Sequence, residues 1–248
     1  MSRIVLTAAS RVGCVRSNNE DMVLAYDKLV RSDAYRTEFM TENTERFVIA
    51  LADGMGGHRA GEVASEQTLS SLKFFIHDIP KGMETGEFEE TMIEWLNFIN
   101  DSINRQGHSD PSLLEMGTTL IGVIYYCGKY FWMNCGDSRL YRLRDGYLTQ
   151  LSTDHSLSNQ LGEKKHSNII TNCIGAECKN SYLDLYEFTS DFLPGDTYMI
   201  CSDGLNDMVS NADIEHLMIE GCSANGLCEA AIEAGGYDNV SVCVFHVE

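Results

Sequence analysis

Short apolar segments, rich in β-branched and aromatic residues, recur along most of the chain and constrain its fold more than any other feature. Segments of this kind are typical of β-strands. Two of them, Tyr141–Arg144 and Tyr147–Leu151, flank Asp145-Gly146, which is a strong signal for a two-residue hairpin. Further strands are predicted at Ile4–Ser10, Phe47–Ala52, Thr118–Tyr126, Tyr130–Asn134, Tyr182–Phe188, Thr197–Cys201 and Val240–Val247.

The predicted helices are grouped in two places along the chain. Glu62–Ile79 and Glu87–Arg105 each carry their apolar residues on one face, and two shorter helices fit Asp213–Ile219 and Gly226–Ala234. Strands in hairpin order with helices grouped in two places favour an α+β layered domain over a repeating βαβ unit. Because the chain has only three prolines, no linker and no repeat, we expect one domain over residues 1–248.

The charge, the apolar content and the cysteines of the chain indicate which partners it can bind and in which compartment it is found. The formal net charge of −19, from 18 basic and 37 acidic residues, argues against binding to nucleic acid or to an anionic membrane. No segment approaches the roughly 20 apolar residues of a membrane span, and Met1–Ser10 has no apolar signal-peptide core. We therefore expect a cytoplasmic monomer. The nine cysteines include no Cys-x-x-Cys pair, which predicts reduced thiols within the core.

Acidic residues gather where apolar segments begin or end. A carboxylate at the tip of a buried strand is held rigidly, and several that converge repel one another unless a cation lies between them. Oxygen-rich sites of this kind suit Mg²⁺ or Mn²⁺. The clusters are Asn18-Asn19-Glu20-Asp21, Asp53-Gly54-Met55-Gly56-Gly57-His58, Gly136-Asp137-Ser138-Arg139, Ser202-Asp203-Gly204-Leu205 and Gly235-Gly236-Tyr237-Asp238-Asn239.

Each cluster has a simpler interpretation when taken alone. Asp-Gly is a common turn dipeptide, so Asp203-Gly204 by itself predicts no more than a turn. The glycines after Asp53 suggest a dinucleotide-binding loop, but Arg59 stands where the third glycine of Gly-x-Gly-x-x-Gly belongs. That interpretation is excluded. A calcium-binding module is also disfavoured, since the chain has no Asp-x-Asp-x-Asp-Gly loop.

Seven short motifs in a fixed order resemble those of the type 2C (PPM) protein phosphatases, and the bacterial single-domain branch in particular. The resemblance runs from the first predicted strand to the last. Its motifs are Arg16-x-x-Asn19-Glu20-Asp21, Ala52-Asp53-Gly54-Met55-Gly56-Gly57-His58, Gly117-Thr118-Thr119, Gly136-Asp137-Ser138-Arg139, Asp154-His155-Ser156, Ser202-Asp203-Gly204-Leu205 and Asp238-Asn239.

The resemblance implies a fold and an activity. The expected fold is a four-layer α-β-β-α sandwich of two mainly antiparallel sheets with a metal cleft at one end. The expected activity is metal-dependent hydrolysis of phosphoserine and phosphothreonine in protein substrates of serine/threonine kinases. A hydroxide bridging two Mn²⁺ or Mg²⁺ ions would attack phosphorus directly, without a phosphoenzyme.

The resemblance also implies a metal-ligand set. Asp53 is expected to bridge both metal ions. Asp203 and Asp238 complete the first site, whereas Glu20 and the carbonyl of Gly54 serve the second.

Five further residues take expected roles. Asp21 acts through water, and Asp137 helps to hold a third, weaker ion. Arg16 binds the substrate phosphate, for which an arginine fork is well suited. His58 is a candidate general acid, with a structural loop role as the alternative. His155 is expected to hydrogen-bond a strand end.

Two regions depart from the family pattern. The flap segment is short, with only residues 157–168 available, and this leaves substrate selectivity open. Residues 27–45 form a polar insertion, which we interpret as a surface loop, with a substrate-contacting segment as the alternative. Two other functions stay open: a non-catalytic adaptor, and a regulatory phosphatase dedicated to one signalling partner.

Overall fold

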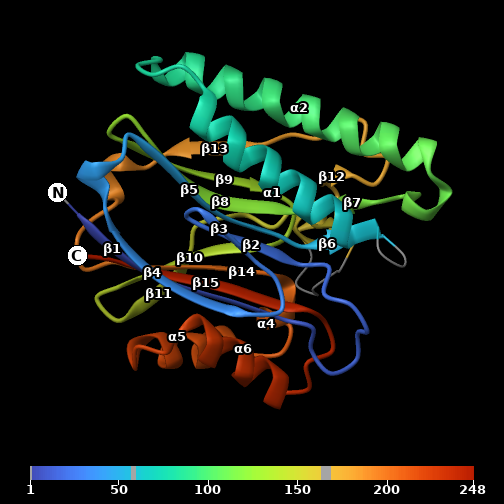
Figure 1. Ribbon diagram of the computed structural model, residues 1–248. Coiled ribbons are helices and arrows are strands. Elements are labelled where there is room, and N and C mark those ends of the chain that lie inside the picture. The colour runs from blue at the N-terminus through green and yellow to red at the C-terminus, as the bar shows by residue number, and fades with distance from the viewer. Residues whose placement is uncertain (1, 57–59, 163–168) are drawn as a thin grey trace.

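Two six-stranded sheets lie face to face in the computed structural model, which describes residues 2–56, 60–162 and 169–248. Sheet A has the strand order β11-β10-β14-β15-β1-β4, and sheet B the order β13-β9-β8-β5-β2-β3. Every pairing within both sheets is antiparallel. Helices α1 and α2 cover the outer face of sheet B, and α5 and α6 cover that of sheet A (Figure 1). The predicted four-layer α+β sandwich is confirmed.

The elements have the following bounds. Sheet A contains β1 (Arg3–Arg11), β4 (Ala34–Met40), β10 (Arg139–Arg144), β11 (Tyr147–Gln150), β14 (Thr197–Cys201) and β15 (Val240–Val247). Sheet B contains β2 (Met22–Ala25), β3 (Lys28–Val30), β5 (Arg46–Ala52), β8 (Leu120–Tyr126), β9 (Lys129–Cys135) and β13 (Asp184–Glu187). A small third sheet contains β6 (Gly54–Met55), β7 (Gly117–Thr118) and β12 (Ile174–Gly175). The helices are α1 (Ala60–Asp78), α2 (Thr85–Ser109), α3 (Leu157–Leu161), α4 (Asp203–Asn206), α5 (Asn211–Ile219) and α6 (Ala224–Glu233), with 3-10 turns at Thr41–Asn43, Pro111–Leu113 and Thr189–Asp191.

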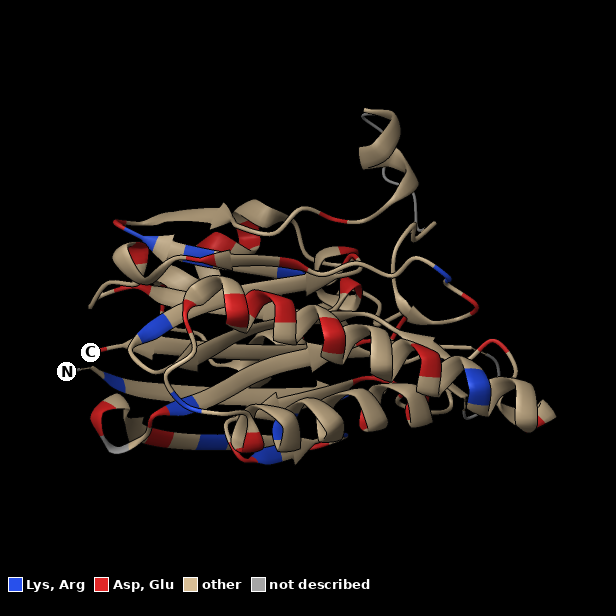
Figure 2. Ribbon diagram, turned by 90° about the horizontal axis from the view of Figure 1, so that it is seen from above, with Lys and Arg blue, Asp and Glu red and all other residues tan. Residues whose placement is uncertain are grey.

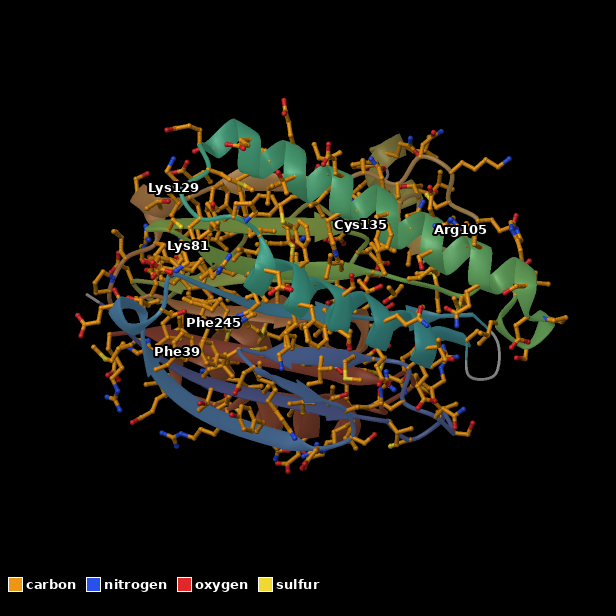
Figure 3. All side chains as sticks on the ribbon, turned by 45° about the horizontal axis from the view of Figure 1, so that its top comes forward. Phe39, Lys81, Arg105, Lys129, Cys135 and Phe245 are labelled. Atoms are coloured by element: carbon orange, nitrogen blue, oxygen red, sulfur yellow. The ribbon has the colours of Figure 1, made fainter. Side chains whose placement is uncertain are left out.

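Three apolar cores separate the four layers. The middle core lies between the two sheets and includes fully buried Phe245 of β15. The partly buried Phe39 of β4 packs against this core from the sheet edge (Figure 3). One outer core joins α1 and α2 to sheet B, and the other joins α5 and α6 to sheet A. Burial alternates along the first part of β1, where Ile4, Leu6 and Ala8 face the middle core and the residues between them are only partly covered.

The predicted hairpin at Asp145-Gly146 is confirmed. Arg144 pairs with Tyr147 across the turn, and both turn residues have positive φ angles, 52° for Asp145 and 81° for Gly146. Two successive positive φ angles match the right-handed twist of the flanking strands, which explains why this dipeptide predicts the turn so well.

The interpretation of residues 27–45 as a surface loop was wrong. Within this segment, β3 pairs with β2 in sheet B and β4 pairs with β1 in sheet A, so the chain crosses from one sheet to the other. Ser32 makes the crossing with a φ angle of 56°. The segment therefore supplies an edge strand to each sheet.

The shortened flap is described in part. Helix α3 begins after Ser156, whose hydroxyl caps it, and ends at Gly162 in a left-handed conformation. Residues 163–168 lie outside the described residues.

One end of the sandwich collects the strand termini that matter for function. Strands β5, β9 and β14 end there, and β2 and β15 begin there, because antiparallel neighbours such as Met22 and Ala52 place opposite termini side by side. This end lies opposite the two chain termini (Figure 1). Among the described residues, no helix has the length and apolar character needed to cross a bilayer.

Candidate metal centre

Asp53 follows the last residue of β5, and its backbone is fixed by two threonines. Its N–H donates to the Oγ1 atom of Thr119 at 3.0 Å, while its carbonyl accepts from the Thr118 hydroxyl at 2.8 Å and from the Thr119 N–H at 2.9 Å. Thr119 Oγ1 in turn lies 2.7 Å from the hydroxyl of Ser138. The Gly117-Thr118-Thr119 motif thus holds the position from which the Asp53 carboxylate projects.

Asp21 is buried directly before β2, with 1% of its surface exposed. Ser202 donates to its Oδ2 atom at 2.9 Å, whereas Oδ1 has no hydrogen-bond partner among the described residues. Burial raises the pKa of Asp21 to about 7, against the hydrogen bonds from Ser241 and Ser202, and the charge of Asp203 raises it further. A buried carboxylate oxygen without a donor is the arrangement that a cation or an ordered water would satisfy.

Asp137 and Asp203 follow β9 and β14 and reach the same end of the sandwich. Burial raises the pKa of Asp137 to about 7, with Asp203 contributing. Burial likewise raises the pKa of Asp203 to about 6, with Asp207 and Asp238 contributing. Each of these carboxylates therefore resists ionisation because of its neighbours as well as its burial.

Asp53 is the common member of this carboxylate cluster, which we define as Asp21, Asp53, Asp137, Asp203 and Asp238. Burial and then all four of the other members raise the pKa of Asp53 well above its ordinary value. After burial, the charges of Asp21 and Asp203 make the largest contributions to this rise in pKa. Carboxylates that converge in this way repel one another unless one carries a proton or a cation lies between them.

The donor set fits hard divalent cations. No group of three or more His, Cys, Asp or Glu side chains within the described ranges has the arrangement of a complete metal site. Mg²⁺ does not require one, because it keeps several waters and is held through one or two carboxylates. The unpartnered Oδ1 of Asp21 is an acceptor open to a cation or its bound water, and the mutual repulsion around Asp53 indicates a negative potential that would favour a cation.

Glu20 lies beside the cluster and is fixed through its backbone. Ser65 of α1 donates to the Glu20 carbonyl at 2.6 Å. A Cβ atom on Gly54 would stand 2.4 Å from the same carbonyl and 2.3 Å from that of Gly61, so only glycine permits this approach. Burial raises the pKa of the Glu20 side chain, the charge of Arg16 opposes this, and Asp238 adds to it.

Arg16 forms an ion pair with Asp238, with 2.7 Å between Nη2 and Oδ2. The Arg16 side chain is 53% exposed, so its remaining donors are accessible from solvent. The structure therefore places the predicted phosphate-binding residue in contact with a predicted metal ligand. His58, the candidate general acid, lies outside the described residues.

His155 hydrogen-bonds a strand end, as predicted. Its Nδ1 accepts from the N–H of Gly136, directly after β9, at 3.1 Å, and its Nε2 lies 3.1 Å from Asp184. The carboxylate of the neighbouring Asp154 accepts hydrogen bonds from Nε and Nη2 of Arg139 at 2.6–3.0 Å. These two motif residues support the frame of the site.

Comparison with known proteins identifies the family. The family model described as protein phosphatase 2C matches residues 25–230. The chain belongs to the protein phosphatase 2C family. It is 34% identical over its full length to the serine/threonine protein phosphatase PstP of Mycobacterium tuberculosis, and it spans 46% of that protein. A putative protein phosphatase 2C-type of Streptococcus pyogenes is 31% identical, with 96% of this chain and 95% of that protein covered.

Solved structures of the protein phosphatase 2C family agree in fold. The serine/threonine phosphatase of S. agalactiae aligns with a TM-score of 0.83 and 31% identity, covering 99% of this chain and all of that one. The catalytic domain of PstP in complex with two manganese ions aligns with a TM-score of 0.76 and 32% identity, covering 100% of this chain and 99% of that one.

The structure adds residues that support this protein phosphatase 2C site and that the sequence did not predict. Arg31 donates through Nε to the carbonyl of Asp21 at 3.0 Å and through Nη2 to that of Glu62 at 2.8 Å. Ser65 donates to the backbone carbonyl of Glu20, and Ser202 donates to the carboxylate of Asp21. Ser202 directly precedes Asp203 within a family motif, so the sequence could have indicated its role. Arg31 and Ser65 belong to none of the motifs, and nothing in the sequence indicated theirs.

Proposed function

We propose that this chain is a metal-dependent phosphatase acting on phosphoserine and phosphothreonine in protein substrates of serine/threonine kinases. The observation that carries the proposal is the carboxylate cluster around Asp53, whose members converge from five strand ends and raise the pKa of its carboxyl together. The names of the relatives support the same activity, and the two manganese ions of the PstP catalytic domain support the same cofactor.

The ligand assignment is the one that the resemblance to the protein phosphatase 2C family implies. Asp53 would contact both ions, with Asp203 and Asp238 on the first. Glu20 and the Gly54 carbonyl would complete the second. When bound, the ions supply a water of lowered pKa and charge that stabilises the transferring phosphoryl group.

The remaining residues act around that centre. Asp21 would accept hydrogen bonds from water through its unpartnered Oδ1, and Asp137 would bind a third, weaker ion. Arg16, oriented by Asp238, would bind two phosphate oxygens through its planar fork and so set the phosphorus in line for attack. His58 remains our candidate for protonating the leaving oxygen.

Hydrolysis of a phosphothreonine peptide, measured by phosphate release with Mn²⁺ and with excess EDTA, tests the proposal. We expect turnover only with metal, and loss of turnover in Asp203→Asn. The matched control is Asp101→Asn, which removes the same charge from an exposed position on α2. Full activity in EDTA would overturn the proposal. Binding of the peptide without turnover, in the presence of metal, would favour the adaptor.

A further inference from the structure

Hydrogen bonds and one ion pair connect the loop between β1 and β2 to residues 236–239, the segment that precedes β15. They involve every second residue of the loop from Val12 to Glu20. The Asn239 amide nitrogen donates to the carbonyls of Val12 at 2.9 Å and Asn18 at 2.8 Å, and its Oδ1 accepts from the N–H of Glu20 at 2.8 Å. Asn239 therefore holds both ends of the loop.

The middle of the same loop is fastened by two further contacts. The N–H of Cys14 donates to the carbonyl of Gly236 at 2.7 Å, and Arg16 pairs with Asp238 at 2.7 Å. Residues 14 and 16 of the loop therefore contact residues 236 and 238, respectively. Val15 lies between the two contacts in the loop, and Tyr237 lies between them in the segment that precedes β15.

These two residues are apolar and project into solvent. Val15 is 64% exposed and Tyr237 is 65% exposed. A single exposed apolar side chain needs no explanation. Here, however, one comes from each segment, and each is the chain neighbour of one member of the Arg16–Asp238 ion pair. The contacts on both sides hold the two segments next to each other at this point.

We propose that Val15 and Tyr237 form an apolar subsite for a large apolar side chain close to the phosphorylated residue of a protein substrate. The proposal rests on the proposed phosphatase function, because it takes Arg16 as the phosphate-binding group. Both residues are chain neighbours of the Arg16–Asp238 ion pair, so a peptide whose phosphate contacts Arg16 would lie close to them.

The charge of the protein favours an apolar neighbour over an acidic one. The chain carries 37 acidic against 18 basic residues, and acidic residues recur along both long helices (Figure 2). An acidic residue next to the phosphate would be repelled by this field. An apolar side chain meets no such penalty and gains by covering the β-branched Val15 and the Tyr237 ring.

The test compares phosphothreonine peptides that differ only in having leucine or serine within two positions of the phosphothreonine. Each kcat/KM is divided by that of the same protein for p-nitrophenyl phosphate, which has no peptide flank. We expect the native protein to prefer leucine by about 5-fold, below the roughly 10- to 200-fold of an enclosed pocket because this subsite is open to solvent. Val15→Ser and Tyr237→Ser should each move the leucine-to-serine ratio towards one.

Two variants serve as controls. Tyr237→Phe keeps the ring and should keep the preference. Tyr147→Ser removes an equally exposed tyrosine, 74% exposed, from β11 and should leave both the preference and the reference activity unchanged. A native ratio near one, or a ratio that survives both serine substitutions, overturns the subsite while the phosphatase function stands. Failure of the native protein with metal to hydrolyse any of these substrates overturns the function and the subsite together.

Discussion

Ser202 donates a 2.9 Å hydrogen bond to the Oδ2 atom of Asp21, although the two residues are 181 positions apart in the chain. Ser202 directly follows β14 of sheet A, and Asp21 directly precedes β2 of sheet B, so this bond joins the two sheets at the candidate metal centre. The other oxygen of Asp21 has no partner among the described residues. A buried carboxylate with one oxygen hydrogen-bonded and the other without a donor can bind a cation or a proton through the second oxygen.

The first prediction concerns the metal-free protein and pH. The folded-state pKa of Asp21 is about 7, above its ordinary value of 3.8, so the folded state binds this proton more tightly than the unfolded state. The resulting stability is complete below the unfolded-state pKa and is lost as the pH rises through the folded-state pKa. In EDTA, the melting temperature should therefore fall as the pH is raised from about 5 to about 8.

Asp21→Asn provides the control, because the amide does not titrate. It should reduce the dependence of the unfolding free energy on pH by up to about 1.4 kcal/mol per pH unit. A melting temperature in EDTA that does not change across this range, in native protein and variant alike, would contradict the prediction.

The second prediction separates stability from activity. Asp53→Asn replaces a carboxyl whose ionised form is disfavoured by burial and by four other carboxylates, so at a pH above its folded-state pKa the variant should melt at a higher temperature than the native protein in EDTA. The same change removes the predicted bridging ligand, and phosphopeptide turnover with Mn²⁺ should fall by more than about 100-fold, the upper range for loss of an outer-sphere partner. Asp101→Asn should alter neither quantity. A less stable metal-free Asp53→Asn protein would argue against repulsion in the cluster.

Local chemistry was enough to predict most of the fold. Asp145-Gly146 adopts the two positive φ angles that its residue types favour, and the apolar periodicity of the two long helices corresponds to α1 and α2. Strand β4 was missed because residues 27–45 are polar overall. Its alternation was nevertheless present: Tyr35, Thr37 and Phe39 are partly buried, whereas Arg36 and Glu38 are exposed. An edge strand that packs on one face only has few apolar residues to reveal it.

The acids of the candidate site were predictable, but the residues that hold them were not. Asp21 and Asp53 stand at the ends of apolar runs and belong to motifs, which makes them visible in the sequence. Arg31 reaches the carbonyl of Asp21 and the hydroxyl of Ser65 across 10 and 34 positions, at 3.0 Å in each case. Such contacts depend on how α1 packs against the sheet edge, and no local pattern encodes them.

The third prediction concerns Arg16 and the substrate phosphate. Arg16→Ala should lower kcat/KM for phosphopeptides by roughly 10- to 150-fold, because a hydrogen bond to a charged group contributes about 1.5–3 kcal/mol. Arg16→Lys should recover only part of the loss, since a point charge lacks the planar fork. The melting temperature should hardly change, because the Arg16–Asp238 pair is exposed and such pairs contribute little. Equal activity of the lysine variant and the native protein would show that only the charge matters.

The fourth prediction concerns Arg139 and Asp154, which pair beneath the site with side chains only 11% and 7% exposed. Arg139→Met leaves the Asp154 carboxylate buried without its main partner, so the unfolding free energy should drop by about 3–5 kcal/mol. Arg3→Met is the matched control, because Arg3 is 43% exposed and its ion pairs with Glu38 and Glu248 lie in solvent, where such pairs contribute little. Urea denaturation of both variants measures the difference. Similar losses in the two would mean that burial gives the Arg139–Asp154 pair no special weight, and the motifs Gly136-Asp137-Ser138-Arg139 and Asp154-His155-Ser156 would then need a role other than supporting the site.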